Sequence, residues 1–411
     1  MTDILNISFE RISERLFTYL CSLYQSGARF PYALQKGQRG NLFGTVFVTY
    51  VAHMLSKVDE LPGCQQIGET LLTFRNPDTG LFTDPDIKPE DYLNLDQHSE
   101  LYVSLQTTSF CYASLQALDA DFDCRMAWLE PLLAAGKLAE WLDELAWSNP
   151  WLVSNLDMFI GNFLLAWHKY KPKDERVNSA IDEYFLWHDQ KQNSATGFWG
   201  DQENLFNAMA GGYHIYIHYD YVNREIKYLD RIIDSTLQLV CRDGLFVYGG
   251  GGGSCEDMDA IDILVRCSVR TDYRAAEIKT VLLSAARMLG SGQLPDGGFS
   301  WRVQPLLADL FNATNGYNYI KRKGYNLLYK ARHRSHYMGE HNYSSLKLYP
   351  FKLNHSDTWS SWFRPLALAF IAKRYPESFR EVCPWSAPEW PGLGFDPFCH
   401  QQTILRETTR G

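Results

Sequence analysis

The sequence predicts an all-α protein, a ring of six helical hairpins of the (α/α)6 toroid class. Three observations predict it: apolar residues recur at helical spacing along most of the chain, strand patterns are few, and a short turn motif repeats. Repetition at a fixed period is the signature of arrays of two-helix units. We find no linker, so we expect a single domain over residues 1–411.

The helical stretches are numerous enough to close such a ring. About twelve or thirteen are expected, at residues 8–25, 41–56, 64–75, 98–118, 126–145, 151–169, 176–189, 203–219, 223–240, 256–270, 274–290, 339–349 and 357–374. Six hairpins use twelve helices. The inner ones should be apolar on nearly all sides and the outer ones amphipathic.

The repeated turn motif joins a glycine to an apolar or aromatic residue just after a helical stretch. It occurs at residues 76–82, 195–199, 242–246 and 295–299, with its glycines at positions 80, 197, 244 and 298. A degenerate unit around residues 134–150 fills the wide first gap. Glycine supplies the left-handed residue that ends a helix, and the next side chain packs under the turn. We therefore interpret the motif as a packing device and expect all four copies at one end of the ring.

Two segments depart from the helical pattern. Residues 302–337 form an irregular insertion with a basic stretch from Lys321 to Arg334, which is either functional or a solvated charged face. Residues 384–411, rich in Pro, Gly and Trp, are expected to be a tail on the surface.

Composition excludes several classes of partner. The net charge of −9 is spread along the chain without a Lys/Arg block, which argues against nucleic acid. The start of the chain lacks the pattern of a secretion signal, and no apolar stretch is long enough to span a membrane. We expect a cytoplasmic protein without stable membrane insertion. Its nine scattered cysteines fit buried thiols in a reducing compartment.

The candidate catalytic residues follow a run of five glycines at positions 249–253. Glu256, Asp257, Asp259 and Asp262 lie within seven residues, and on a helix those three apart share a face. Crowded carboxylates on an apolar wall cannot all ionise cheaply, so one of them can act as an acid near neutral pH. The alternative is that they only cap the helix.

Candidate substrate-binding residues lie near the starts of other helices expected inside the ring. They are His98, Asp157, His214, His218, His355, Asp357, Trp359, Trp362 and Arg364. His214 and His218 are one turn apart and bind substrate or belong to the core. The two tryptophans can stabilise a carbocation, stack on a sugar ring or simply pack in the core.

No cofactor or metal is expected. A phosphate loop and a dinucleotide fingerprint are both missing, so ATP and NAD are not implied. The two histidines lack the intervening Glu of the metalloprotease pattern, and a zinc site at Cys255, Asp257 and His355 is a minor alternative.

Two segments resemble known families. Residues 291–301, Ser-Gly-Gln-Leu-Pro-Asp-Gly-Gly-Phe-Ser-Trp, are similar to the repeated motif of squalene and other class II terpene cyclases, shared more loosely with the β subunits of protein prenyltransferases. Asp257-Met258-Asp259-Ala260 resembles the Asp-x-Asp-Asp signature of those cyclases. The resemblance implies a helical toroid with Asp259 as proton donor. Ala260 stands where the family has a further Asp, which Glu256 or Asp262 can replace. The β subunits bind zinc through Asp, then Cys two residues later, and a distant His; here the order of Cys255 and Asp257 is reversed.

Three functions remain open after this reading. The first is a terpene-cyclase-like enzyme acting on an isoprenoid, with Asp259 as general acid in an aromatic-lined cavity. The second is a carbohydrate-active hydrolase or lyase that uses paired carboxylates on a saccharide. The third is a toroid that binds a ligand without catalysis. A deep apolar cavity favours the first, and a site lined by polar side chains favours the second.

Overall fold

The computed structural model describes residues 4–91, 99–123, 125–241, 244–246, 253–301, 341–342, 346, 348–352 and 354–398. Within them the chain forms twelve α-helices: α1 (Phe9–Ser22), α2 (Leu42–Met54), α3 (Cys64–Leu72), α4 (Ser99–Ala117), α5 (Lys137–Glu144), α6 (Pro150–Tyr170), α7 (Glu175–Lys191), α8 (Leu205–Tyr221), α9 (Leu229–Leu237), α10 (Ser254–Arg270), α11 (Ala275–Ser291) and α13 (Thr358–Arg374). Short 3-10 helices lie at Val58–Glu60, Pro89–Asp91, Ala127–Leu133 and Pro376–Ser378.

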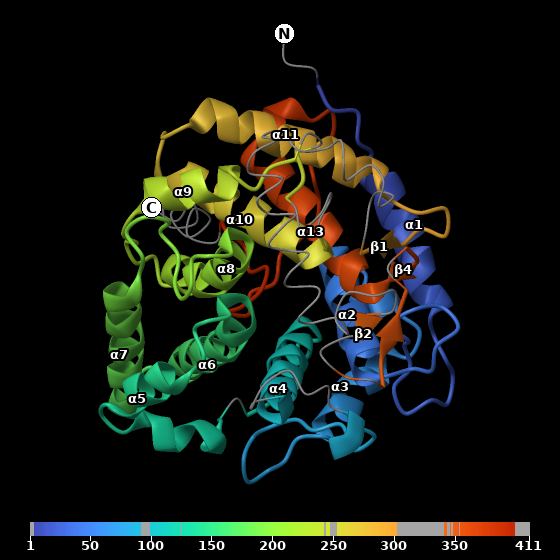
Figure 1. Ribbon diagram of the computed structural model, residues 1–411. Coiled ribbons are helices and arrows are strands. Elements are labelled where there is room, and N and C mark those ends of the chain that lie inside the picture. The colour runs from blue at the N-terminus through green and yellow to red at the C-terminus, as the bar shows by residue number, and fades with distance from the viewer. Residues whose placement is uncertain are drawn as a thin grey trace, which may run out of the picture.

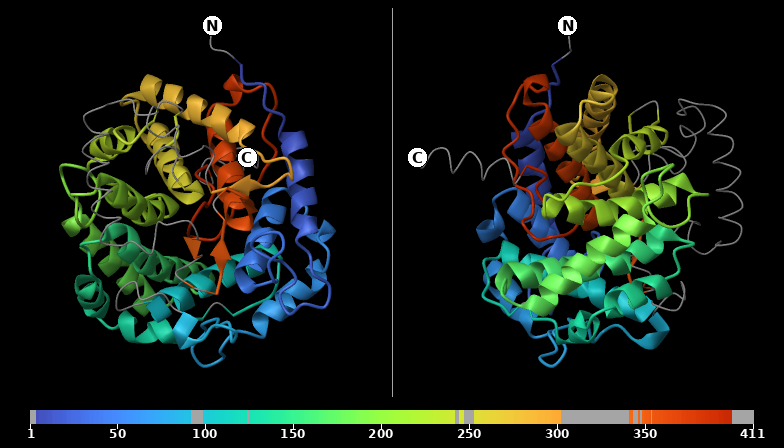
Figure 2. Two further views of the ribbon diagram at one scale, coloured as in Figure 1. Left: turned by 45° about the vertical axis from the view of Figure 1, so that its right-hand side comes forward. Right: turned by 90° about the vertical axis from the view of Figure 1, so that its left-hand side faces the viewer.

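The helices form an α/α toroid, which confirms the predicted fold class. α2, α4, α6, α8, α10 and α13 each pack against the next, and α13 packs back against α2, so the inner ring closes (Figure 1). The remaining helices lie outside them. Figure 2 shows the same arrangement from two further sides, with the outer helices as a shell. Along the chain, outer and inner helices alternate as six hairpins.

Burial separates the two kinds of helix as the sequence predicts. Every residue of α8 from Phe206 to Asp220 is buried, as is every residue of α13 from Thr358 to Ala372. The outer helix α7 instead buries one face, which includes Val177, Ala180 and Tyr184. None of the described helices combines the length and apolar character needed to cross a bilayer.

Aromatic side chains fill the middle of the ring. The ring of Phe47 on α2 lies 5.0 Å from that of Trp359 on α13 and 5.3 Å from that of Phe110 on α4, and Tyr50 lies 4.7 Å from Trp362. Such contacts stabilise a core beyond the area that they bury. Trp359 and Trp362 therefore have the packing role that we left open for them.

Each copy of the turn motif connects an outer helix to the next inner helix, so the four copies share the end of the ring where the inner helices begin. Gly80, Gly197, Gly244 and Gly297 all have positive φ, from 80° to 97°. In the fourth copy the left-handed residue is Gly297, whereas we expected Gly298. A Cβ on any of the four would lie within 2.6 Å of an atom of a neighbouring outer segment. The motif recurs because it is where adjacent hairpins dock.

Strands are few and short. β1 (Phe299–Ser300) pairs antiparallel with β4 (Ser356–Asp357), and β2 (His341–Asn342) pairs antiparallel with β3 (Pro350–Phe351). The prediction of a helix at residues 339–349 is therefore wrong for those of its residues that the structure describes. The stretch at 126–145 is also not one helix: Gly136, with φ 80°, separates a 3-10 helix from α5. The insertion at 302–337 lies outside the described residues.

The tail is more deeply buried than the surface tail that we expected. In the C-terminal strap, residues 384–398, the side chains of Trp385, Trp390 and Phe395 are 2%, 4% and 1% exposed. The Trp390 ring stacks on Tyr112 of α4 at 5.7 Å. The strap lies along one side of the ring in Figure 2, right, and covers one end of the inner helices. Apolar aromatic residues in this segment explain the difference, because the ring end offers them a partner.

The docking role of the turns yields a test with a matched control. Gly136→Ala meets open space, so only the left-handed backbone opposes it, at a cost of roughly 1–2 kcal/mol. Gly197→Ala has the same φ, but its Cβ would lie 2.5 Å from Ile232 Cγ1 and 2.9 Å from Ile232 N. Overpacking adds roughly 1–3 kcal/mol. Chemical denaturation should show the larger loss for Gly197→Ala, and equal losses would contradict the docking role.

Candidate functional site

Helix α10 brings the four candidate carboxylates into the interior. It begins after Gly253, and Glu256, Asp257, Asp259 and Asp262 are all buried, with at most 5% of each residue exposed. As an inner helix it contacts α8, α9, α11 and α13. The predicted placement on an inner helix is thus confirmed, but none of the four carboxylates lines either of the two cavities described below. Buried carboxylates require partners or protonation, and the four differ in which they have.

Asp257 is held by a buried guanidinium. Arg364 Nη1, from α13, lies 3.0 Å from Asp257 Oδ2, and the Phe246 backbone N donates to Asp257 Oδ1 at 2.8 Å. Arg364 also donates to the carbonyls of Ser300 and Trp301. Burial raises the pKa of Asp257 to about 7, although Arg364 and the Phe246 amide oppose the rise. Arg364, expected to bind substrate, therefore has a structural task here.

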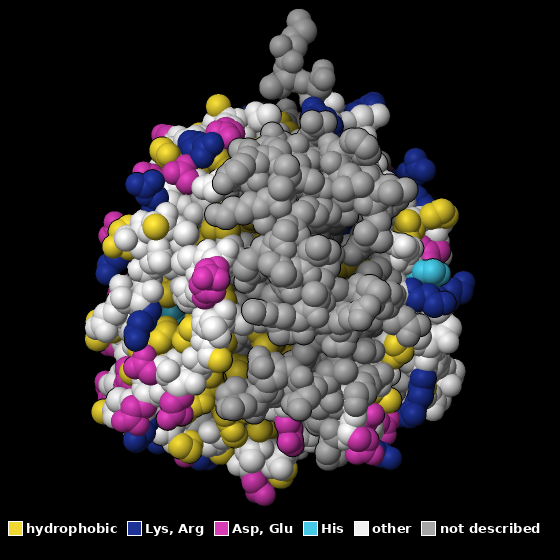
Figure 3. Space-filling view, in the orientation of Figure 1, with side chains coloured by type: hydrophobic (Ala, Val, Ile, Leu, Met, Phe, Trp, Pro, Cys, Tyr) yellow, Lys and Arg dark blue, Asp and Glu magenta, His cyan; other side chains and the backbone are white. Residues whose placement is uncertain are grey.

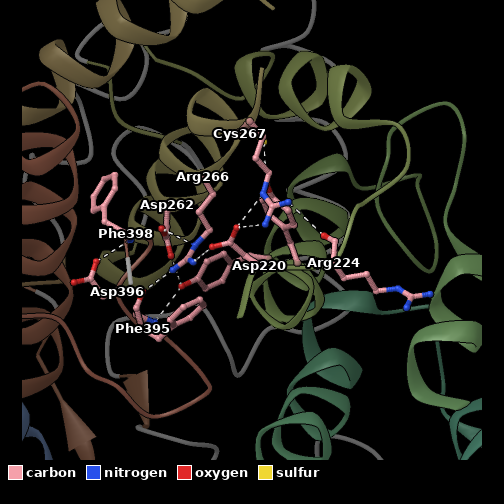
Figure 4. A network of polar contacts seen from close by, with 12 residues as sticks. Asp220, Arg224, Asp262, Arg266, Cys267, Phe395, Asp396 and Phe398 are labelled. Atoms are coloured by element: carbon pink, nitrogen blue, oxygen red, sulfur yellow. Dashed lines mark hydrogen bonds and ion pairs between the residues drawn. The ribbon is translucent and has the colours of Figure 1, made fainter. Parts of the chain in front are cut away.

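Asp262 is held from α8 and from its own helix (Figure 4). Tyr213 OH donates to Asp262 Oδ2 at 2.9 Å, and Arg266 Nε lies 2.9 Å from Asp262 Oδ1. Arg266 also pairs with Asp220 and donates to the Phe395 carbonyl of the strap. Burial raises the pKa of Asp262 to about 6 against the opposing effect of Arg266.

Asp259 differs from both. It is 2% exposed, and among the described residues no hydrogen-bond partner lies near its Oδ1. Burial raises its pKa well above the usual range, and the negative charges of Glu256, Asp262 and Asp257 add to the rise. Its spacing from Asp262 places both on one face of the helix, toward Tyr213. Among the four carboxyls, Asp259 is therefore the one whose surroundings favour the protonated form without an opposing cation.

Glu256 lies at the start of the helix against a tryptophan. A Cβ on Gly253 would lie 1.9 Å from Glu256 Oε2 and 2.2 Å from the Trp301 ring, so only glycine fits there. Cys255 is adjacent, and burial, Glu256 and Asp259 together raise the pKa of its thiol. A raised pKa keeps this thiol protonated and argues against a nucleophilic role.

The start of α13 joins the start of α10 through hydroxyl groups. Asp357 caps α13, accepting from the Ser360 backbone N at 2.6 Å and from Ser360 Oγ at 2.7 Å. Ser254 Oγ donates to Ser360 Oγ at 3.1 Å. Burial raises the pKa of Asp357 to about 7. Asp357, expected to bind substrate, thus connects the two helix starts.

Two cavities lined by described residues differ in character. One, of about 20 Å³, lies within the ring among apolar and aromatic side chains that include Tyr50, Phe110, Trp362 and Trp390. The other, of about 430 Å³, lies beside the start of α13 and is lined by Gln35, Lys36, Gly37, Gln38, Asp296, Pro350, Lys352, His355 and Ser356. His355 is exposed there, in the second cavity.

The other predicted binding residues lie apart from this cluster. Asp157 Oδ2 lies 2.8 Å from His188 Nε2, so this side chain of α6 faces the outer helix α7. His218 lies 2.9 Å from the Tyr184 hydroxyl and 2.9 Å from the Asn162 amide. These contacts favour the core alternative for His218 and place Asp157 away from the acidic cluster.

His214 also lies in the core, where its Nδ1 is 2.8 Å from Ser154 Oγ. Burial lowers the pKa of both His214 and His218 to about 3, so both are neutral. His98 lies outside the described residues. Within those residues, no group of three or more His, Cys, Asp and Glu side chains is arranged to hold a metal ion.

The sequence analysis missed several residues of the candidate site and of the larger cavity. Tyr213 and Arg266 position Asp262, and Gln35 forms the base of the larger cavity. The signal for Arg266 was its spacing four residues after Asp262, an ion pair on one helix face. Nothing local marks Gln35, because its partners lie more than 300 residues away.

Comparisons with known proteins give little. No protein-family model matches the chain, and no curated protein matches it. Among solved structures it is similar to the GH76A alpha-1,6-mannanase from Salegentibacter sp. HEL1_6, at 11% identity and a TM-score of 0.42, over 78% of this chain and 100% of that one. A likeness this low carries no argument about function. The resemblance to terpene cyclases remains a prediction from two motifs.

The buried pair can be tested through stability. Arg364→Met removes the guanidinium and leaves the Asp257 carboxylate buried without it, so the free energy of unfolding should fall by roughly 3–5 kcal/mol. The control Arg176→Met removes an exposed ion pair with Asp174 and should cost at most about 1 kcal/mol. Adding Asp257→Asn to Arg364→Met should restore part of the loss. Equal effects of the two arginine variants would contradict a buried pair.

The pKa values also predict how stability depends on pH. Asp257 and Asp357 titrate near pH 7 when folded and near 4 when unfolded, so the native state binds more protons between those values. The free energy of unfolding should therefore decrease as pH rises from about 4 to 7. Asp357→Asn keeps a capping side chain but removes one of the two titrating carboxyls. The melting temperature of this variant should therefore depend less on pH than that of the wild type. An unchanged pH dependence would contradict the assigned pKa.

Proposed function

We propose that the protein is an acid–base enzyme of the carbohydrate-active hydrolase or lyase type, with Asp259 as proton donor. The observation that carries the proposal is the position of Asp259, buried on an inner helix beside three other carboxylates and with no partner for its Oδ1 among the described residues; burial first, and then those carboxylates, raise its pKa. A carboxyl of this kind transfers a proton at neutral pH, which an ordinary surface Asp cannot do. Proton transfer to a leaving oxygen is the step that glycoside cleavage requires.

The cavities support a polar substrate over an isoprenoid. The ring interior around Trp362 and Phe110 leaves about 20 Å³, room for roughly one water molecule. Ligand sites measure about 300–1,000 Å³. The cavity of about 430 Å³ falls in that range and is lined mainly by polar side chains. It lies at the end of the ring where α10 begins.

A second carboxylate completes the chemistry. Glu256 precedes Asp259 by three residues, so the two share a helix face, with Glu256 nearer the helix start. In hydrolysis, Asp259 would give its proton to the glycosidic oxygen as the C–O bond breaks, and Glu256 would take a proton from the attacking water. Asp257 and Asp262, each held by an arginine, raise the pKa of Asp259.

The cyclase reading keeps one specific observation in its favour. Asp259 occupies the position of the acid in the motif resemblance, and Trp359 lies beside Cys255, one helical turn from Asp259. The same protonated carboxyl would then protonate an alkene. The two functions differ in substrate, so one panel distinguishes them.

The test combines a substrate panel with a conservative variant. Neutral and acidic oligosaccharides and prenyl diphosphates are incubated with the protein, and products are detected by mass spectrometry. Asp259→Asn keeps the shape of a neutral carboxyl but has no acidic proton, so turnover should fall by at least about 10²-fold. Thermal stability should change little, because the wild-type carboxyl is already uncharged.

The control is Asp182→Asn, on the exposed face of α7, which should retain full turnover. Turnover only on prenyl diphosphates would favour the cyclase. Full turnover by Asp259→Asn on the identified substrate would show that Asp259 is not the acid. Binding without turnover of any compound would leave the non-catalytic toroid as the better account.

A further inference from the structure

The larger cavity carries an unusual concentration of positive charge for a chain of net charge −9. Lys36, Lys352 and His355 line it, and all three are exposed. Among the described residues neither lysine forms an ion pair, whereas Lys57, Lys137 and Lys279 each pair with a glutamate. On the face shown in Figure 3, by contrast, acidic and basic side chains of the described residues are interspersed.

The cavity is built on a buried side chain. Gln35 is 5% exposed, and its Nε2 donates to the Lys352 carbonyl at 2.9 Å and to the His355 carbonyl at 3.4 Å. Its Oε1 accepts from the Lys352 backbone N at 2.8 Å. One amide thus fixes the backbone of both Lys352 and His355 against the loop that carries Lys36. Lys36, Lys352 and His355 line the same cavity because Gln35 connects their segments.

One carboxylate in the cavity limits the class of ligand. Asp296 Oδ1 accepts from Ser356 Oγ at 2.6 Å and from the Gly298 backbone N at 3.2 Å. A carboxylate repels a bare inorganic anion but accepts hydrogen bonds from hydroxyl groups. The two lysines that line the same cavity can bind a carboxylate through charge-assisted hydrogen bonds. The combination fits a molecule that carries both hydroxyl groups and one negative charge.

A short path of hydrogen bonds leads from this cavity to the acidic cluster. Ser356 in the cavity wall precedes Asp357, which accepts from Ser360, and Ser360 accepts from Ser254 at the start of α10. Ser254 lies two residues before Glu256. Buried side chains therefore connect one wall of the cavity to the start of α10.

We propose that this cavity is a subsite for the carboxylate-bearing ring of an acidic saccharide, a uronate, with Lys36 and Lys352 binding its carboxylate and Asp296 its hydroxyl groups. The proposal rests on the proposed function and names its substrate class. A volume of about 430 Å³ accommodates one or two sugar rings.

The test measures binding directly. Glucuronate, glucose and inorganic phosphate are titrated into the full chain by calorimetry or by ligand-observed NMR. The double variant Lys36→Gln, Lys352→Gln should bind glucuronate at least about tenfold more weakly, the loss expected for hydrogen bonds to charged groups. Lys173→Gln, an exposed lysine between α6 and α7, is the matched control and should bind as the wild type does.

Each other outcome overturns the subsite. Glucuronate that binds no better than glucose, or equally well to the double variant, shows that the cavity holds no carboxylate. Phosphate that binds as tightly as glucuronate shows a general anion site. These results are independent of Asp259→Asn. Loss of turnover in Asp259→Asn together with unchanged glucuronate binding in the lysine variant keeps Asp259 as the acid and rejects the subsite. Full turnover in Asp259→Asn together with weakened glucuronate binding in the lysine variant keeps the subsite and rejects Asp259 as the acid.

Discussion

The charge balance along α10 is the constraint on which the rest of the structure depends. Four carboxylates on this buried helix face two buried guanidinium groups, Arg364 and Arg266. Both arginines also contact other segments. Arg364 donates to the carbonyls of Ser300 and Trp301. Arg266 pairs with Asp220 and donates to the Phe395 carbonyl of the strap. The same contacts that neutralise α10 therefore tie α13, α8 and the strap to it. Ring closure and site electrostatics are parts of one arrangement.

That balance explains why the pKa of one carboxyl, Asp259, is raised well above its usual range. Isolated burial of a charge is expensive, and an ion pair offsets the cost only where its geometry is complete. Asp257 and Asp262 each have a guanidinium and a further donor. Among the described residues Asp259 has neither, and burial together with the charges of Glu256, Asp262 and Asp257 raises its pKa. The acid that we propose is thus the one carboxyl of the four that lacks a hydrogen-bond partner among the described residues at its Oδ1 and has no arginine beside it. Placing a third arginine there would stabilise the charged form and remove the acid.

The sequence predicted what depends on local chemistry. The four glycine turns were found because each needs a left-handed residue, and the inner helices because they are apolar throughout; the acidic cluster was found because its members are neighbours in the chain. Asp157 and His218 were assigned to the substrate because both lie on inner helices. Their partners, His188 and Tyr184, lie on an outer helix, and periodicity does not show which neighbour a polar side chain faces.

Long-range pairing explains what was missed. The loop containing Gln35 meets residues 352–355 only when the ring closes, so no spacing in the sequence marks the cavity there. The strap was expected on the surface for the same reason. Trp390 packs on Tyr112, which is distant in the chain, and no residue near Trp390 in the sequence indicates this contact. The strap covers one end of the ring, and aromatic side chains fill its interior. The turns, the helix starts of α10 and α13 and the polar cavity all lie at the other end, which is where we propose that a substrate binds.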